Sequence, residues 1–331
     1  QELASRHYDL DVTARELPSY VDQNFRLRDR AGAEFVLKIM NSGEDPALLE
    51  AQVSVLDLLQ AQPGRFRTPR LVRCSAGFPV TREGSHAVWL VTYLPGRLLA
   101  DLPELPAALL HDLGRGLGEL DRRLAHFDDP GTRRAYRWDL RNAPGVEPFT
   151  EYIADDRGRR EVRARLARFA EGALPVIERL PFQVIHNDAN DHNVLVKGDG
   201  DEARVSGLLD FGDIVWTARA CEPAIAMTYP MMSEADPLEA GARVIAGYHA
   251  ALPLKRSEVR AIPYLIEARL CVSVTMSAYR LMVDPANAYL AVSEVPAWHL
   301  LDWMSSNPPS GWVNVFEDAC ESVSPMGEDA P

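Results

Sequence analysis

Long apolar runs are missing from this sequence. A helix that crosses a bilayer needs about 20 consecutive, mainly apolar residues, and no stretch approaches that length. The N-terminal segment, QELASRHYDL, also lacks the apolar core of a secretory signal. We therefore expect a chain with no membrane partner, located in the cytoplasm.

Cysteine is scarce as well. The four cysteines are Cys74, Cys221, Cys271 and Cys320, and no two of them form a C-x-x-C pair. Zinc ribbons and thioredoxin-like redox motifs both need such pairs. Buried, reduced thiols in a cytoplasmic protein are therefore the expected state.

Basic charge is in deficit, since 35 Lys and Arg residues face 48 Asp and Glu residues, for a net charge of −13. An acidic surface repels phosphate backbones, so we expect no nucleic-acid partner. Apolar residues make up 47% of the chain, an ordinary share for a globular protein with its own core. A cationic small substrate is compatible with this charge but not required by it.

Two strands, a helix and a third strand are predicted in the N-terminal part of the chain. Apolar and β-branched residues indicate strands at residues 24–29, 34–40 and 87–94. Apolar residues at helical spacing indicate a helix over 44–62, with Ser42 as its cap and Pro46 in its first turn. This part of the chain is therefore expected to be rich in β-structure.

Helical patterns dominate after the turn-prone LPGR at 94–97. The expected helices cover residues 105–127, 157–180, 238–251, 257–281 and 298–304, with short strands at 184–186, 194–197 and 204–211. The arginines of 157–180 are expected to form a solvated face with ion pairs such as Glu161 with Arg165.

The order of these elements predicts an α+β fold with two lobes. A small β-rich lobe, residues 1–94, leads through a hinge near 92–96 into a larger, mostly helical lobe, residues 95–316. The acidic and polar tail, 317–331, is expected to be disordered or a linker.

One loop, VIHNDANDHNVLV at 184–196, carries more polar groups than a turn needs. His186, Asp188 and Asn193 match the H-x-D-x-x-x-x-N catalytic loop of kinases, and a D-F-G at 210–212 follows. An Asx-rich turn with a chance D-F-G is the alternative, but the joint occurrence makes it improbable. The loop therefore predicts phosphoryl transfer.

The residue types fit that chemistry. Asp188 is expected to accept the hydrogen bond of an attacking hydroxyl and take its proton. Asn193 and Asp210 offer the hard oxygen ligands that Mg²⁺ prefers, and are expected to hold it against the phosphates of ATP. His186 is expected to brace the loop, with Asp191 and His192 tying it to itself.

A kinase also needs a strand lysine and a helix glutamate that orients it. Lys38 ends the apolar run FVLK, close to the V-A-I-K pattern, and Glu50 lies in the following predicted helix. Glu34 and Glu44 are weaker alternatives for the glutamate. A solvent-exposed Lys38 and Glu50 are the alternative reading.

The glycine-rich phosphate loop of protein kinases is absent. The corresponding segment reads SYVDQNFRL, residues 19–27, so backbone amides and the side chains of Gln23 and Asn24 are expected to cover the phosphates. No A-P-E follows the D-F-G. Both absences argue against a protein kinase.

At these motifs the sequence resembles the aminoglycoside phosphotransferase and choline kinase-like family, over residues 3 to 305. HNDANDHNVLV, LLDFGD, VTYLPG and the glycine-free DQNF loop all fit that family. SYVDQNF with FVLKI, and the two loops, are similar to hydroxylysine kinases and to kinase domains fused to class III aminotransferase-like enzymes. The resemblance implies a bilobal protein-kinase-like fold with a nucleotide-binding lobe at 1–94 and a catalytic and substrate-binding lobe at 95–316.

The resemblance also implies a role for each matching residue. Asp188 would be the base, Asn193 and Asp210 the metal ligands, and Lys38 the α/β-phosphate contact held by Glu50. The phosphates would lie under Gln23, Asn24 and Phe25, and adenine would meet the backbone of Thr92, Tyr93 and Leu94. Two departures stand out, because the family usually has Gly at Asn187, and many relatives have Asp at Glu222.

The acceptor is expected between the catalytic loop and the C-terminal helices. Asp213, Trp216 and Glu222 are candidates for binding an ammonium through charge and cation–π contact. The alternative is a packed Trp216 and a Glu222 that stabilises a helix N-terminus. Tyr229, Met231 and Met232 are expected in the core.

These features lead to a Mg-ATP-dependent kinase for a hydroxyl group of a small amino acid or amino alcohol, with 5-hydroxylysine the leading expectation. An aminoglycoside-type antibiotic phosphotransferase is an alternative with the same chemistry. A catalytically silent nucleotide-binding module of a fused protein is the other. The fused relatives also imply a pyridoxal-phosphate-dependent partner enzyme, which would eliminate the phosphate from the product.

Overall fold

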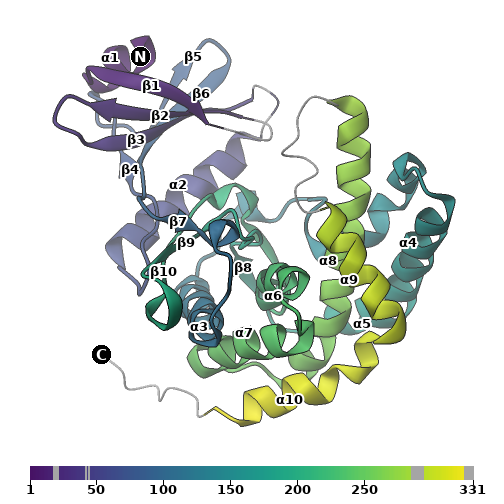
Figure 1. The fold of residues 1–331 in the computed structure, drawn as a ribbon. Coiled ribbons are helices and arrows are strands. Elements are labelled where there is room, and N and C mark those ends of the chain that lie inside the picture. Colours follow the sequence, from purple (N-terminus) through teal and green to yellow (C-terminus); the bar gives the residue numbers. More distant parts are fainter. Residues whose placement is uncertain (18–21, 42, 44, 285–293, 324–331) are drawn as a thin grey trace.

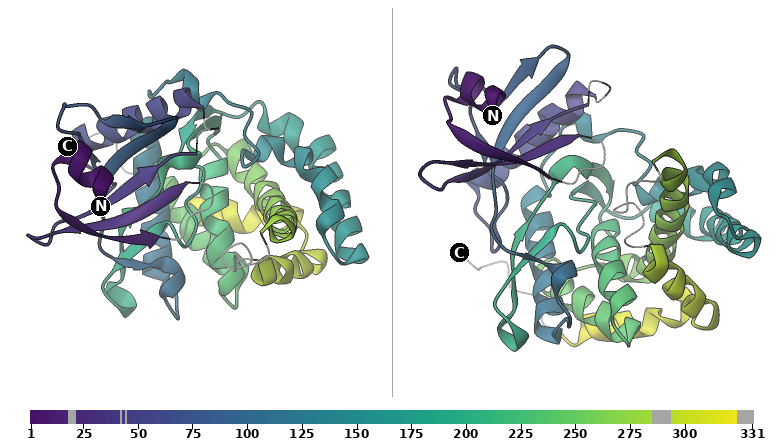
Figure 2. Two further views of the ribbon diagram at one scale, coloured as in Figure 1. Left: turned by 90° about the horizontal axis from the view of Figure 1, so that it is seen from above. Right: turned by 45° about the horizontal axis from the view of Figure 1, so that its top comes forward.

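The computed structural model describes residues 1–17, 22–41, 43, 45–284 and 294–323. A lobe built on an antiparallel sheet stands beside a larger, mainly helical lobe (Figure 1). The two further views show the same division into two lobes (Figure 2). The α+β, bilobal fold expected from the sequence is confirmed.

The sheet of the smaller lobe has six antiparallel strands, with the order β1-β2-β3-β6-β4 and β5 paired with β6. Its elements are α1 (Glu2–Tyr8), β1 (Val12–Leu17), β2 (Gln23–Asp29), β3 (Glu34–Ile39), β4 (Leu71–Val72), β5 (Val80–Glu83) and β6 (His86–Thr92). Helix α1 packs Ala4 and Tyr8 into the same apolar cluster as Leu27, Leu37 and Leu90 of the sheet. The cluster fixes β3, and with it Lys38.

The predicted helix after β3 is α2 (Pro46–Ala61). Asp45 caps it, because its carboxylate accepts the Ala47 N–H at 2.9 Å. The expected cap, Ser42, lies outside the described residues.

The larger lobe contains α3 (Ala107–Leu124) and α7 (Pro237–Ala251). At the point where these two helices cross, their backbones are too close for a side chain to fit between them. A Cβ on Gly114 would lie 1.8 Å from the Val244 carbonyl oxygen, and one on Gly247 would lie 1.9 Å from that of His111. Glycine at the crossing therefore lets the two backbones touch.

The remaining elements complete the larger lobe, which carries the loop at 186–193 (Figure 1). The helices are α4 (Asp156–Arg168), α5 (Leu174–Ile177), α6 (Cys221–Ser233), α8 (Arg256–Val283), α9 (Glu294–Ser306) and α10 (Val313–Glu321), with a long 3₁₀ helix at Leu140–Tyr152. The short strands are β7 (Arg97–Leu98), β8 (Phe182–Ile185), β9 (Val194–Lys197), β10 (Arg204–Leu208) and β11 (Val215–Ala218). Antiparallel pairing joins β9 to β7 and β10, and β8 to β11.

Three expectations about these elements need correction. The segment 157–180 is not one helix, because a π-helical turn at Phe169–Ala173 separates α4 from the short α5. Strand β1 was not predicted, and the range of helix α6 was not either, although Glu222 was given as a possible helix N-terminus. The tail does not begin at Glu317, which lies in α10 and accepts ion pairs from Arg256 and Arg260 at 2.7 and 2.8 Å.

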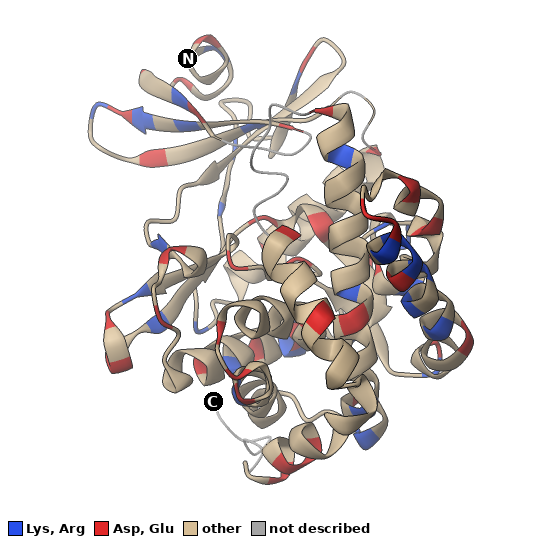
Figure 3. Ribbon diagram, turned by 45° about the vertical axis from the view of Figure 1, so that its right-hand side comes forward, with Lys and Arg blue, Asp and Glu red and all other residues tan. Residues whose placement is uncertain are grey.

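Other expectations about the chain are confirmed. All four cysteines are buried free thiols. Basic residues gather along α4 (Figure 3), where Arg165 pairs with Glu161 at 2.6 Å as predicted. Arg165 is buried, however, and also pairs with Glu267, so the expected solvated face does not include it. Within the described residues, one helix, α8, is long and apolar enough to span a membrane, and 83% of that window is buried inside the fold, as in a core helix.

Candidate active site

The loop between β8 and β9 is held from below by His186, which is fully buried. Its Nδ1 accepts the Asp188 N–H at 3.2 Å, and its Nε2 donates to the Leu209 carbonyl at 2.8 Å. This pattern assigns the proton of the neutral ring to Nε2. The ring also meets the edge of Phe211 with centroids 4.8 Å apart, so the loop and the D-F-G segment share one brace.

Asn187 has a left-handed backbone, with φ of 67°. Asn is among the few residues that adopt this conformation readily. Its N–H donates to the carboxylate of Glu222 at 3.0 Å, and its side-chain amide donates to the Trp138 carbonyl at 3.3 Å. The departure from Gly at this position is therefore accommodated.

Glu222 takes the alternative position given in the sequence analysis, the N-terminus of a helix, and is not a substrate contact. Its side chain is fully buried at the start of α6, and one carboxylate oxygen anchors the loop backbone at Asn187. The geometry gives Glu222 a positioning role for the loop, since a carboxylate without solvent access cannot contact a bound ammonium.

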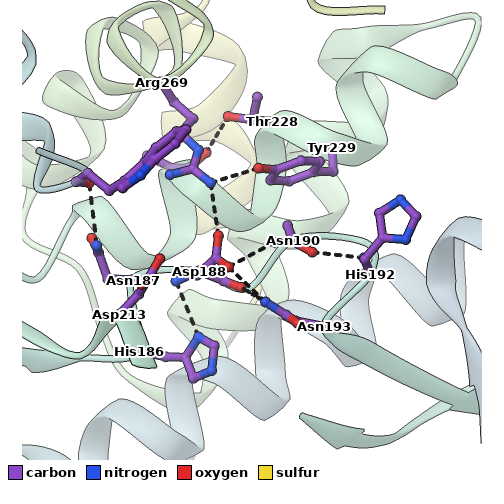
Figure 4. A network of polar contacts seen from close by, with 12 residues as sticks. His186, Asn187, Asp188, Asn190, His192, Asn193, Asp213, Thr228, Tyr229 and Arg269 are labelled. Carbon is purple, nitrogen blue, oxygen red and sulfur yellow. Dashed lines mark hydrogen bonds and ion pairs between the residues drawn. The ribbon is translucent and has the colours of Figure 1, made fainter. Parts of the chain in front are cut away.

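Asp188 is the centre of a dense polar network (Figure 4). Its Oδ1 accepts from Arg269 at 2.9 Å, while its Oδ2 accepts from Asn190 and Asn193 at 2.9 and 2.8 Å. A carboxylate offers about four lone-pair positions, so these three bonds leave one for an acceptor hydroxyl. Burial raises the pKa of Asp188 to about 6, although the charge of Arg269 opposes that rise.

Arg269, on α8, is a site residue that the sequence analysis missed. Only 3% of it is exposed, and its Nη2 also donates to the Tyr229 hydroxyl at 2.8 Å. The guanidinium lies 4.8 Å from the centre of the Trp138 ring. The available signal was a lone cation inside the apolar helical stretch around it, because a buried arginine needs a partner.

Asn193 and Asp210 offer oxygen ligands on adjoining segments. The Asn193 amide nitrogen donates to Asp188, which leaves its Oδ1 as an acceptor, and the Leu209 N–H donates to the Asn193 carbonyl at 2.8 Å. Asp210 accepts from Gly212 N–H at 3.2 Å, and its φ of 50° is left-handed. The positive charge of Lys38 lowers the pKa of Asp210 and keeps it anionic.

This donor set fits Mg²⁺. Among the described residues, no three His, Cys, Asp or Glu side chains form a metal-binding group. Magnesium characteristically takes only one or two protein ligands and completes its shell with phosphates and water. One amide oxygen and one carboxylate are therefore sufficient.

Lys38 reaches Asp210 rather than the expected glutamate. Its Nζ lies 2.9 Å from Asp210 Oδ1 and 5.5 Å from the centre of the Trp89 ring. Glu50 is exposed, because α2 buries the face that carries Leu48 and Leu49. The expected Lys38–Glu50 pair is thus not formed.

The two alternative glutamates do not take its place. Glu34 forms a bidentate pair with Arg26, at 2.7 and 2.8 Å from its Nη2. Glu44 lies outside the described residues.

The residues expected to contact nucleotide line the strands next to Lys38. Asn24 lies directly opposite Lys38 in the β2–β3 register, while Gln23 faces Ile39 and Phe25 faces Leu37. Residues 18–21 of the same segment lie outside the described part of the chain.

In the hinge, the N–H groups of Thr92 and Tyr93 already donate, to the carbonyls of Arg70 and Glu34. Within the described chain, the Leu94 N–H donates to no backbone carbonyl. Of the three expected adenine contacts, Leu94 is therefore the one with an amide to offer.

The other two candidates for the acceptor side lie close to the D-F-G. Asp213 accepts the Tyr136 hydroxyl, and burial together with the nearby Asp188 raises the pKa of Asp213 to about 7. Trp216 packs on Phe182 with ring centroids 4.8 Å apart, and the Arg133 guanidinium covers it at 4.2 Å. The Arg133 guanidinium thus already covers one face of the Trp216 ring, which was expected to contact a substrate ammonium.

The two lobes, the H-x-D-x-x-x-x-N loop and the D-F-G together define a kinase-like phosphotransferase. A sequence model described as the phosphotransferase enzyme family, APH, matches residues 13–259. The chain belongs to this family, and it is an ATP-dependent phosphotransferase whose acceptor is an alcohol group.

Named relatives agree with this assignment. The chain is 31% identical to a hydroxylysine kinase of Danio rerio over 312 residues, which cover 88% of this chain and 86% of the relative. An amicoumacin kinase in complex with AMP-PNP, Ca²⁺ and Ami has the same fold, with a TM-score of 0.69, 15% identity, and coverage of 91% and 92%. A microcompartment-associated aminopropanol kinase follows, with a TM-score of 0.65, 15% identity, and coverage of 94% and 98%.

Proposed function

We propose that this protein phosphorylates a hydroxyl group of a small amino acid, with 5-hydroxylysine as the first candidate, and uses Mg²⁺ with ATP. The observation that carries the proposal is Asp188, a buried carboxylate with three partners and one remaining position for a hydroxyl. The similarity to a hydroxylysine kinase over 88% of the chain supports the choice of acceptor.

Asp188 would orient the acceptor hydroxyl and hold its proton as the oxygen attacks the γ-phosphorus. Asn193 and Asp210 would hold Mg²⁺, which when bound neutralises charge on the phosphates. Lys38, with Asn24 opposite it in the sheet, would contact the α- and β-phosphates. His186, Asn190 and Arg269 keep the base in position.

The remaining nucleotide contacts belong to the smaller lobe, residues 1–94. Gln23, Asn24 and Phe25 would cover the phosphates, and the Leu94 N–H would donate to adenine. Asp213 and Trp216 would line the acceptor side, within the lobe formed by 95–316. Glu50 would act only after α2 moves toward Lys38, because its side chain is exposed.

We place the protein in the cytoplasm, which the four free thiols support. A pyridoxal-phosphate-dependent lyase, fused or separate, is the partner that would consume a phosphorylated amino compound.

An ADP-release screen tests the function. Hydroxylated amino acids, amino alcohols and aminoglycosides would be compared at saturating Mg²⁺ and ATP, with Asp188→Ala as the control. We expect 5-hydroxylysine to stimulate turnover and Asp188→Ala to lower kcat at least a thousandfold, a typical loss for a group that both positions and deprotonates the nucleophile (roughly 10²–10⁴ for the proton transfer alone).

Three outcomes would contradict the proposal. Turnover with aminoglycosides alone would favour an antibiotic phosphotransferase. Nucleotide binding without turnover on any acceptor would favour a silent module. Full acceptor-dependent turnover by Asp188→Ala would refute the assignment of the base.

A further inference from the structure

Negative charge is concentrated around the base. Asp188, Asp210 and Asp213 influence one another electrostatically, so this region attracts an ammonium and repels a carboxylate. An amino-acid substrate carries both groups. Its carboxylate therefore needs a cation at some distance from Asp188.

Three of the cations near the base are already engaged. Lys38 pairs with Asp210 and Arg269 with Asp188, while Arg134 donates to the Gly212 carbonyl at 3.0 Å and covers the Tyr136 ring at 3.8 Å. Arg269 is also enclosed by protein, so a ligand has no access to it.

Arg137 differs from these three. It is exposed, and its neighbours in sequence both belong to the site, since Tyr136 donates to Asp213 and Trp138 underlies Arg269. Its guanidinium lies 4.4 Å from the centre of the Phe149 ring, and its Nη1 is 4.0 Å from the weak acceptor Met276 Sδ. Within the described chain, no carboxylate forms an ion pair with Arg137, and its donors remain for a ligand.

The contact of Arg137 with Met276, which lies on α8, indicates a length for that ligand. Arg269 contacts the base, and Met276, which Arg137 touches, lies seven residues further along the helix. Seven residues rise about 10 Å and return to nearly the same helix face. A hydroxyl on the δ-carbon of an extended amino acid lies roughly 7 Å from its carboxylate, and a hydrogen bond at each end adds about 3 Å. The sum, about 13 Å, is of the same order as the helix rise of about 10 Å.

We infer that Arg137 binds the α-carboxylate of the amino-acid substrate while the distal hydroxyl faces Asp188. The inference rests on the proposed function and adds a specificity residue to it. A planar guanidinium fork suits a carboxylate, and stacking on Phe149 holds that fork in place. Amino acids with a hydroxyl on the β-carbon are too short to join the two groups.

The test uses two acceptors of nearly equal size, 5-hydroxylysine and its α-carboxamide, with the wild type, Arg137→Gln and Arg137→Lys. We expect Arg137→Gln to raise the KM for 5-hydroxylysine at least tenfold, with kcat within twofold. The KM for the carboxamide should not change, and Arg137→Lys should recover part of the loss. Arg179→Gln removes the same charge from another exposed arginine, and should leave both KM values unchanged.

The possible outcomes distinguish a failure of the Arg137 role from a failure of the proposed function. A wild type that uses 5-hydroxylysine, with an Arg137→Gln variant that loses affinity equally for acid and amide, overturns the role of Arg137 alone. An equal KM of the wild type for 5-hydroxylysine and its carboxamide also overturns the role of Arg137. A wild type inactive on both compounds overturns the proposed function, and the role of Arg137 falls with it.

Discussion

At the residue scale, Asp188, the proposed base, depends on contacts from distant parts of the chain. Arg269 and Asp188 are 81 residues apart, yet they form an ion pair at 2.9 Å, as short as that of Lys38 with Asp210. A buried arginine with few partners costs free energy. The ion pair with Asp188 and the hydrogen bond to the Tyr229 hydroxyl offset part of that cost.

Arg269→Gln should therefore lower kcat by about a hundredfold, the loss expected when a reacting group is displaced by about an ångström. The KM for ATP should change little, and Arg269→Lys should restore part of the rate. Tyr229→Phe is the matched control, because it removes the other acceptor of the same Nη2 and keeps the bond to Asp188. An equal loss in Tyr229→Phe would contradict a specific role for the Arg269–Asp188 contact.

The protonation of Asp188 predicts a pH profile. Its pKa is raised to about 6 by burial, and only the ionised carboxylate accepts a proton. The active fraction is thus complete well above pH 6 and is lost as the pH falls through that value. The measurement is kcat/KM from pH 5 to 8, where the acid limb should approach a tenfold fall per pH unit. A profile that stays flat down to pH 5 would contradict it.

At the element scale, the contact between α3 and α7 depends on glycine. Gly247→Ala should lower the free energy of unfolding by roughly 1–3 kcal/mol, a typical cost of overpacking, because the new methyl group meets the His111 carbonyl. Urea unfolding measures the change. Gly172→Ala is the control, since its Cβ would meet nothing within 4 Å, and it should not destabilise the protein.

Elements with one buried face were predicted from the sequence, whereas others were not. The apolar spacing of α2, and the predicted strands that became β2, β3 and β6, came from periodicity and composition. Helix α6 lacks such a face, because its residues from Cys221 to Met231 are all buried, so no polar stripe marks its period. Strand β1 was not predicted for the opposite reason: four of its six residues are exposed, so it lacks an alternating apolar face. The cap of α2 depended on local geometry at Asp45.

The site shows the same limit. The types and spacing of Asp188, Asn193 and Asp210 indicated the chemistry, because all three lie close together in the sequence, between residues 188 and 210. Arg269, Glu222 and Arg137 belong to the site only through tertiary packing. A burial estimate for single residues would have been needed to separate Glu222, which anchors the loop, from a substrate contact.

At the scale of the whole molecule, the Lys38–Asp210 pair joins the two lobes. A ligand that binds both lobes of the folded state should stabilise the whole chain. With Mg²⁺ and a non-hydrolysable ATP analogue at a hundredfold excess over Kd, we expect about 2.7 kcal/mol of stabilisation, seen as a higher melting temperature. Removing Mg²⁺ with a chelator, or Asp210→Asn, should remove most of the rise. An unchanged shift in Asp210→Asn would contradict its role as a metal ligand.

The network around Asp188 also has a consequence for folding. The base is held by a residue that follows β8, by a loop anchored to α6 through Glu222, and by Arg269 on α8. If any one of these segments detaches, the position of the Asp188 carboxylate changes. Catalytic activity therefore requires all three contacts, and during refolding it should return only when α6 and α8 have docked against the loop.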